Sequence, residues 1–380
     1  MLIEIEIICK ISYICQMISI ISMKSPLLVW WTFFVLWSCA MKNKKEVSTA
    51  PATELTNKKT KWQLLSKQKA LIFMSVPFVL YMILFRYIPL LGWTMAFQNY
   101  KPAKGFLGSA WVGLQHFKAL LFQIDSATGL ALRDAVTGKL CWNTEFLFAL
   151  RNTICMSLIS TALGYITAII LAVFMNEVKS LVIKRFVQTV SYLPHFLSWI
   201  IVVGLVQNFL SVEDGIINNI LLALGFIKEP IKFLSIPKYF WNIVGWTYVW
   251  KEVGWNTIVY LGAMTAIDPC LYEAAQIDGC GRLRKIWHIT LPGIKPTVII
   301  MLIMSAGHIL DANFEMPYLM QNGMIYDVAN QIDMYVLKYG FKLFNFSLAT
   351  AAGIFKNIVN ITLLLIANGI AKKAGEERLI

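Results

Sequence analysis

The pattern of apolar positions divides the chain into long hydrophobic stretches separated by polar and basic segments. Each stretch is about 20 residues long or longer, which is the length that an α-helix needs to cross a bilayer. The pattern therefore predicts an all-α integral membrane protein with six spanning helices. These helices are expected at about residues 70–92, 146–175, 186–210, 241–265, 297–319 and 346–370.

Lysine and arginine gather in alternate polar segments, which is the bias that cytoplasmic loops show. Residues 41–69 form a basic tail, Lys179, Lys184 and Arg185 follow the second stretch, and residues 372–380 close the chain with further basic side chains. With residues 70–371 as the transmembrane domain, both termini are predicted to be cytoplasmic.

The first forty residues do not fit the six-helix pattern. Their two apolar patches are interrupted by Lys10 and Lys24 and are individually short for a spanning helix. Residues 1–40 are either an extra apolar helix or signal-like anchor, or they precede the true start at Met41. We favour Met41; a seventh helix would place the N-terminus outside.

Composition supports a membrane protein and excludes an ordinary soluble domain. Of the 380 residues, 58% are apolar and 14% are charged, whereas apolar usage in soluble domains is about 45–50%. The net charge of +13 is spread over segments that flank apolar stretches, which favours the positive-inside bias over nucleic-acid binding. The expected environment is the lipid bilayer, and no nucleic-acid partner is expected.

The sequence offers no residues for chemistry of its own. The seven cysteines form no CxxC pair or metal-ligand spacing, and the four histidines are scattered. The phosphate-binding pattern GxxxxGK[ST] is absent, and neither a catalytic triad nor a paired-carboxylate site is recognisable. We therefore expect no enzymatic activity, no cofactor and no metal site in this chain.

Residues 267–296, between the fourth and fifth stretches, carry their own helix start and stop signals. Asp268 suits the N-cap position and Pro269 the first helical turn. Gly279 and Gly281 provide left-handed positions at which the helix can end. A helix is therefore predicted to start at about residue 269 and to stop at these glycines.

A second short helix is predicted from about Arg282 to Thr290, with Pro292 ending it. The two helices and the turn between them would project from the membrane. Ala274 and Ala275 leave a low surface that another protein's backbone can approach closely, and the second helix is basic. The segment therefore has the features of a docking element.

The same segment matches a known spacing: Glu-Ala-Ala, three residues, Gly, nine residues, Ile, one residue, Leu-Pro. On this ground the chain resembles the permease subunits of ABC importers. That resemblance implies a six-helix (type I) bundle with a cytoplasmic coupling helix, which sits in a cleft of the ATPase subunit. Without the resemblance, the segment would be an ordinary cytoplasmic loop with an alanine-rich helix. The matching residues are Glu273, Ala274, Ala275, Gly279, Ile289, Leu291 and Pro292.

The stretches 188–205, 250–261 and 267–297 resemble the LplB-type group of the maltose-permease-like family, and the resemblance extends from about residue 61 to the C-terminus. It implies a permease for an oligosaccharide or polysaccharide in the bacterial cytoplasmic membrane. The implied partners are a second homologous permease, two cytoplasmic ATPase subunits that bind the ATP, and an extracellular sugar-binding lipoprotein.

Ionisable side chains inside spanning helices are costly and are therefore candidate functional groups. Here they stand among aromatic and amide side chains, which a carbohydrate path needs for stacking on sugar rings and for hydrogen bonds to hydroxyls. The competing interpretation is that Lys251 and Glu252 pair with neighbouring helices and only hold the bundle together. The substrate-path candidates are Trp250, Glu252, Trp255, Asn256, Asp311, Asn313 and Glu315.

An ion-coupled secondary transporter is the alternative function. In that case Glu252, Asp311 and Glu315 would be ion ligands. Secondary carriers commonly consist of repeated halves with interrupted helices at matching positions. This sequence has no convincing internal repeat, and such a carrier has no need of the spacing from Glu273 to Pro292.

Overall fold

The computed structural model describes residues 69–124, 132–133, 140–311 and 313–375. The chain divides into two compact units at Gly92, and each is described by itself. The predicted extension at residues 1–40, the basic tail at 41–69 except its last residue, and the final residues 376–380 lie outside the described residues.

The first unit contains the beginning of the first predicted span. Helix α4 (Lys69–Met82) passes into a π-helical turn, η1 (Ile83–Tyr87), and then into a 3-10 helix, η2 (Ile88–Phe97), which continues into the second unit. The run Phe73–Phe97 is long and apolar enough to cross a membrane, with a mean hydropathy of 1.7. The structure agrees with the predicted span and extends it by several residues.

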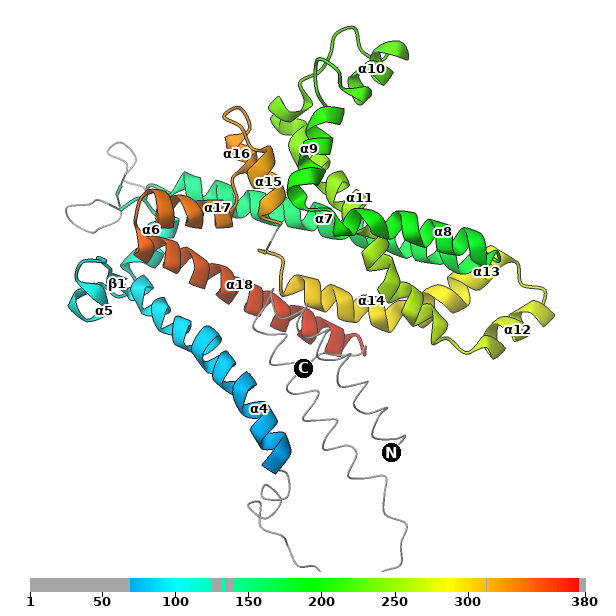
Figure 1. Ribbon diagram of the computed structural model, residues 1–380, viewed down its shortest axis with the longest axis horizontal. Helices are drawn as coiled ribbons and strands as arrows, with labels where there is room; N and C mark the ends of the chain where they lie inside the picture. Colours follow the sequence, from blue (N-terminus) through cyan, green and yellow to red (C-terminus); the bar gives the residue numbers. More distant parts are fainter. Residues whose placement is uncertain (1–68, 125–131, 134–139, 312, 376–380) are drawn as a thin grey trace, which may run out of the picture. The chain divides into compact units, whose positions relative to one another are not determined.

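Two long helices, α7 (Thr144–Glu177) and α11 (Pro237–Thr265), pack side by side in the second unit (Figure 1). Small residues allow the close approach, as is common between membrane helices. A Cβ atom added to Gly245 would lie 2.7 Å from a side-chain carbon of Ile159. The hydroxyl of Thr257 also donates a hydrogen bond to the carbonyl of Ala168 across the interface (3.2 Å). This pair forms the most extensive contact between two helices of the second unit.

The third predicted span, residues 186–210, corresponds to a broken helix in the structure. Helix α8 (Leu181–Tyr192) runs into a 3-10 turn, η3 (Leu193–Phe196), and α9 (Trp199–Phe209) then leaves at an angle of 102° (Figure 1). Pro194 lies in the turn, and the Ser198 side chain accepts a hydrogen bond from the Ile201 N–H (3.4 Å), so that a new helix begins.

The fifth span is displaced from its predicted position at residues 297–319. Helix α13 (Arg282–Lys285), the π-helical turn η5 (Ile286–Thr290) and α14 (Leu291–Ala306) form one continuous apolar run. The predicted end at Pro292 was therefore wrong. A π-helical turn directly before Pro292 gives the room that the proline ring needs, as local changes of helix geometry do in membrane proteins.

The remaining elements form the segments between the long helices and the last span. Helix α18 (Phe346–Lys373) agrees with the sixth predicted span. The others are β1 (Gln98–Asn99) paired antiparallel with β2 (Ala110–Trp111), and the helices α5 (Gly105–Gly108), α6 (Gln115–Leu121), α10 (Ile216–Ala223), η4 (Phe233–Ser235), α12 (Pro269–Ile277), α15 (Glu315–Met320), α16 (Tyr326–Ala329), α17 (Ile332–Leu337) and η6 (Lys338–Lys342).

Four described helices are long and apolar enough to cross a membrane, and a fifth span results if the bent pair α8–α9 is counted as one. The 29-residue helix α11 is long enough but is not among them, because polar and charged side chains lie in its middle. The predicted set of six spans thus corresponds to four apolar helices, one broken helix and one polar helix.

The second unit has two distinct ends. Helix α12 and the turn between α7 and α8 lie at one end, whereas α6 and α17 lie at the other (Figure 1). The Ser347 hydroxyl, at the start of α18, accepts a hydrogen bond from the Tyr100 N–H (2.9 Å), which ties the segment after β1 to the second end. Two of the segments predicted to face the cytoplasm, the turn between α7 and α8 and the helix α12, therefore lie at the same end.

Candidate coupling and substrate sites

Helix α12 begins and ends where the sequence predicts. The Asp268 carboxylate accepts a hydrogen bond from the Cys270 N–H (2.9 Å), and this caps the helix. At the other end Gly279 is left-handed, with φ of 72°. The N–H of Cys280 donates to the carbonyl of Ala275 (2.9 Å), which is the long hydrogen bond of a Schellman motif. Both ends of the helix are fixed by local chemistry.

Gly281 does not act as the second left-handed position that was predicted. Its φ is −68°, and it is the N-cap of α13 instead. The prediction was wrong because one left-handed glycine already completes the Schellman motif. The chain then needs only an extended residue to start the next helix.

Two contacts hold α12 against the start of the fifth span. The hydroxyls of Tyr272 and Thr290 lie 2.9 Å apart and share a hydrogen bond. Ile267 packs onto Gly293, where an added Cβ atom would lie 2.5 Å from the Ile267 side chain. These contacts connect α12 and the residue before it to this span.

The residues of the Glu-Ala-Ala spacing divide into two groups. Glu273, Ala274 and Gly279 are exposed and Ala275 is half-buried, all on α12 or its C-terminal turn. Ile289 and Leu291 are half-buried and Pro292 is exposed, all within the continuous run that becomes the fifth span. The first group is available to a partner, whereas the second lies on the span that α12 is attached to. The role of all seven residues in coupling to an ATPase stays a prediction.

Exposed apolar side chains accompany the first group, which sequence reasoning did not single out. Ile277 is 88% exposed and Leu283 is 75% exposed, and Leu271 is also exposed. Exposed apolar groups beside small residues are typical of an interaction surface. The signal in the sequence was their position on two short helices within a polar segment, with Leu283 between Arg282 and Arg284.

Replacing Gly279 by alanine should loosen the end of α12. Nothing lies within 4 Å of an added Cβ atom, so the substitution causes no clash. Its only cost is the free energy of holding a residue with a side chain in the left-handed conformation, about 1–2 kcal/mol. We expect the amide of Cys280 to exchange its hydrogen at least about fivefold faster, measured by hydrogen exchange and mass spectrometry. Gly281→Ser is the matched control, because serine suits an N-cap position; equal exchange in both variants would contradict the prediction.

The candidates on α11 meet the break between α8 and α9. The buried ammonium of Lys251 donates to the carbonyl of His195 (2.6 Å) and lies 5.1 Å from the ring centre of Trp199. The Glu252 carboxylate lies 2.7 Å from His195 Nδ1, and Trp255 stacks on the His195 ring at 4.3 Å between ring centres. The predicted alternative, in which Lys251 and Glu252 pair with a neighbouring helix, describes this geometry.

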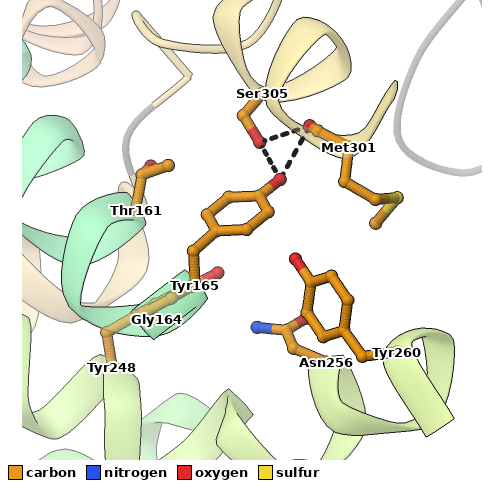
Figure 2. A pocket seen from close by; sticks show the side chains of 8 residues that line it. All are labelled: Thr161, Gly164, Tyr165, Tyr248, Asn256, Tyr260, Met301 and Ser305. Carbon is orange, nitrogen blue, oxygen red and sulfur yellow. Dashed lines mark hydrogen bonds between the residues drawn. The ribbon is translucent and has the colours of Figure 1, made fainter. Parts of the chain in front are cut away.

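Asn256 lines a different space, a cavity of about 190 Å³ between α7, α11 and α14. Figure 2 shows the side chains of Asn256 and Tyr260 pointing from α11 toward Tyr165 of α7. The Tyr165 hydroxyl donates to the carbonyl of Met301 (2.7 Å) and contacts the hydroxyl of Ser305. The cavity is therefore rich in hydroxyl and amide groups inside the helix bundle, as a carbohydrate path requires.

Trp250 is separated from both of these places. Its side chain lines an apolar groove of about 440 Å³ between α9, α10 and α11, together with Phe209 and Trp246. Hydrogen-bonding groups are scarce along this groove, so the groove favours an apolar neighbour over a sugar.

The last three candidates follow the fifth span instead of lying inside it. Asp311 pairs with Lys356 of α18 (2.8 Å), and Lys356 also pairs with Asp333 of α17 (2.7 Å). Asn313 is half-buried, and Glu315 is exposed at the first position of α15. Of the seven substrate-path candidates, only Glu252 and Trp255 share a cluster with each other.

Sequence reasoning missed the partners of these charges. His195 and Lys356 were not singled out, although each neutralises or orients a candidate carboxylate. A lysine in the middle of an apolar stretch is itself a signal, because it must find a partner there. Among the described residues, no group of three or more His, Cys, Asp or Glu side chains could hold a metal ion.

Comparison with known proteins assigns the family. Residues 162–375, more than half of the chain, match the family described as binding-protein-dependent transport system inner membrane component. The chain is 40% identical over 339 residues to the polygalacturonan/rhamnogalacturonan transport system permease protein YteP of Bacillus subtilis (strain 168), covering 88% of this chain and 99% of that protein. It is 38% identical over 315 residues to protein LplB of the same organism, covering 83% and 92%.

Solved structures agree with this assignment. A chain in the crystal structure of a bacterial ABC transporter involved in the import of the acidic polysaccharide alginate is 35% identical, with a TM-score of 0.70 over 82% of this chain and 98% of that chain. The predicted all-helical importer fold is thereby confirmed, and the family consists of transport permeases. The chain belongs to the family of binding-protein-dependent transport system inner membrane components, the membrane-embedded permease subunits of ABC importers.

Proposed function

We propose that this chain is a transmembrane subunit of an ABC importer that carries an oligosaccharide or polysaccharide across the cytoplasmic membrane. The observation that carries the proposal is the similarity over 99% of the length of a permease named for polygalacturonan and rhamnogalacturonan transport. The hydroxyl-rich cavity between α7, α11 and α14 supports a carbohydrate path. The path would then pass Asn256 and Tyr260.

Helix α12 is the proposed connection to the ATPase. Its Glu273 and Ala274 are exposed, both of its ends are capped, and the Tyr272–Thr290 hydrogen bond ties it to the fifth span. A rigid helix that is attached to a span can pass the partner's movement to the bundle and shift it between two states. The end of the unit that carries α12 would face the cytoplasm, as would the C-terminus.

The proposed complex contains a second homologous permease, two ATPase subunits that bind ATP, and an extracellular sugar-binding lipoprotein. The structural neighbour supports the last of these, because its transporter has been crystallised with an alginate pentasaccharide-bound periplasmic protein (TM-score 0.71, 35% identity). In this arrangement the opposite end of the unit, with α6 and α15 to α17, would face the binding protein.

The ion-coupled alternative has little support. Glu252 is paired with His195 and Lys251, and Asp311 is paired with Lys356. A carboxylate that is already neutralised by a cation is a poor ligand for a second one. The pairing therefore favours a structural role for these two charges over ion binding.

Reconstituted vesicles test the proposed function. With the permease pair, the ATPase subunits and the binding protein present, labelled oligosaccharide should accumulate only with ATP, and an ionophore should not reduce its uptake. Uptake that persists without the ATPase subunits and follows an imposed ion gradient would overturn the proposal. Parallel assays with neutral and acidic oligosaccharides would define the cargo.

A further inference from the structure

A polar cavity of about 300 Å³ lies among α15, α16, α17 and η6, at the end of the unit opposite α12. A second cavity, of about 570 Å³, shares Gln321 and Tyr326 with it and therefore adjoins it. These volumes fall within or near the range of small-ligand sites. The polar and aromatic residues that line the first cavity are Tyr318, Gln321, Tyr326, Asn330, Lys338 and Lys342.

The wall of the cavity is fixed to the long helix α7. The buried amide of Asn152 donates to the carbonyls of Asp327 (2.8 Å) and Asn330 (2.9 Å). The N–H of Ile332 donates to the Thr153 hydroxyl (3.0 Å). The cavity is therefore built on the bundle and is not merely a fold of a surface loop.

The two lysines at the cavity differ in their surroundings. Lys338 lies 2.7 Å from the carboxylate of Glu145, and this hydrogen bond raises the pKa of Lys338. Its positive charge is thus held and locally balanced. Lys342 is exposed, and within the part of the chain that the structure describes it has no ion pair. Lys342 is therefore the charge that remains available to a ligand.

The other lining groups suit a sugar. Tyr318 and Tyr326 are both more than one third exposed, so their rings remain accessible, and Gln321 offers an amide that can both donate and accept. The adjoining cavity is lined by Asp327, which carries a carboxylate. That carboxylate repels an anion, so a negatively charged sugar ring fits the first cavity better than the second.

We propose that the first cavity is an entry site for an acidic oligosaccharide, in which Lys342 binds the carboxylate of one uronate residue. The proposal rests on the proposed function and specifies the charge of the cargo. It places the first contact with the cargo at the end of the unit that is proposed to face the binding protein. Lys338 would remain paired with Glu145 and leave this contact to Lys342.

The test compares Lys342→Gln with wild type in the assembled complex in lipid nanodiscs. The probe is a short, fluorescently labelled oligogalacturonate, and its binding is measured by anisotropy. We expect Lys342→Gln to weaken binding about fivefold, the upper range for one exposed charge pair, and Lys342→Arg to restore it. Lys232→Gln removes another exposed lysine, outside the cavity, and should have no effect. A neutral oligogalactoside of the same length should not distinguish the variants.

Three outcomes would overturn the entry site: no binding of the acidic probe to the wild-type complex, equal binding by Lys342→Gln and wild type, or an equal loss in Lys232→Gln. Uptake by reconstituted vesicles is a separate readout. Normal probe binding without ATP-dependent uptake of any oligosaccharide would count against the proposed function and leave the entry site standing.

Discussion

Replacement of Gly254 by alanine should strongly destabilise the folded permease. Gly254 is buried on α11, where an added Cβ atom would overlap the carbonyl carbon and oxygen of Ser191 at the end of α8. These are backbone atoms, so no side-chain rotation relieves the overlap. We expect a loss of about 3 kcal/mol or more in the free energy of unfolding, at the upper end of the cost of overpacking.

The measurement is the thermal midpoint of the detergent-solubilised complex, followed by fluorescence-detected size-exclusion chromatography. Gly262→Ala is the matched control, because Gly262 lies on the same helix and nothing lies within 4 Å of its added Cβ atom. Alanine should be neutral or slightly stabilising there, since glycine inside a helix costs about 1 kcal/mol. Equal thermal midpoints for Gly254→Ala and Gly262→Ala would contradict the close approach of Gly254 to the Ser191 backbone.

This contact explains why the size of the bend in the third span does not follow from the sequence of that span alone. Pro194 is a local signal for a helix break and Ser198 for a new helix start, but a membrane helix often continues through a proline without breaking. The 102° bend also depends on α11, which supplies Gly254 for the close approach and the Lys251 ammonium for the His195 carbonyl. These partners are more than 50 residues away in the chain, so the pattern within residues 186–210 does not contain them.

The ends of helix α12, in contrast, are determined by residues close to one another in the sequence. Its N-cap, its first-turn proline and its left-handed glycine act within a few residues of one another, and the sequence predicted both ends correctly. The error came directly afterwards, where Pro292 was taken as a stop. The π-helical turn η5 lets the helix continue through this proline and moves the fifth span toward the N-terminus. The proline alone does not tell whether a helix stops before it or continues through such a turn.

The substrate-path candidates were chosen by residue type, and the structure separates them for a physical reason. A charged side chain in a membrane helix must find an opposite charge or a carbonyl, so Lys251 and Glu252 of α11 and Lys356 of α18 are largely engaged by other residues of the chain. Neutral hydroxyl and amide groups carry no such requirement and can line a cavity, as Tyr260 and Asn256 do (Figure 2). In this bundle the polar neutral residues are therefore the better candidates for contact with cargo.

Replacement of Glu273 by alanine should disconnect the permease from its ATPase while leaving the bundle intact. Glu273 is exposed on α12, and no ion pair involves it among the described residues, so its loss should not change the thermal midpoint of the chain. A residue that anchors an interface typically contributes about 2 kcal/mol or more, which corresponds to about 30-fold weaker association. Transport should fall accordingly, and Ala274→Leu should have a similar effect because it fills the low surface at which the partner approaches.

Three measurements on the same preparations decide this prediction: co-purification of the ATPase subunits, cargo-stimulated ATP hydrolysis and uptake into vesicles. Asp278→Asn is the matched control, since it removes another exposed carboxylate from the end of the same helix, where the side chain lies on a different face. Loss in Glu273→Ala and Ala274→Leu with normal behaviour of Asp278→Asn would locate the contact on the Glu-Ala-Ala face. If the ATPase subunits bind and respond normally with both Glu273 and Ala274 replaced, α12 is not the coupling helix, and force must reach the bundle through another segment at this end, such as the turn between α7 and α8.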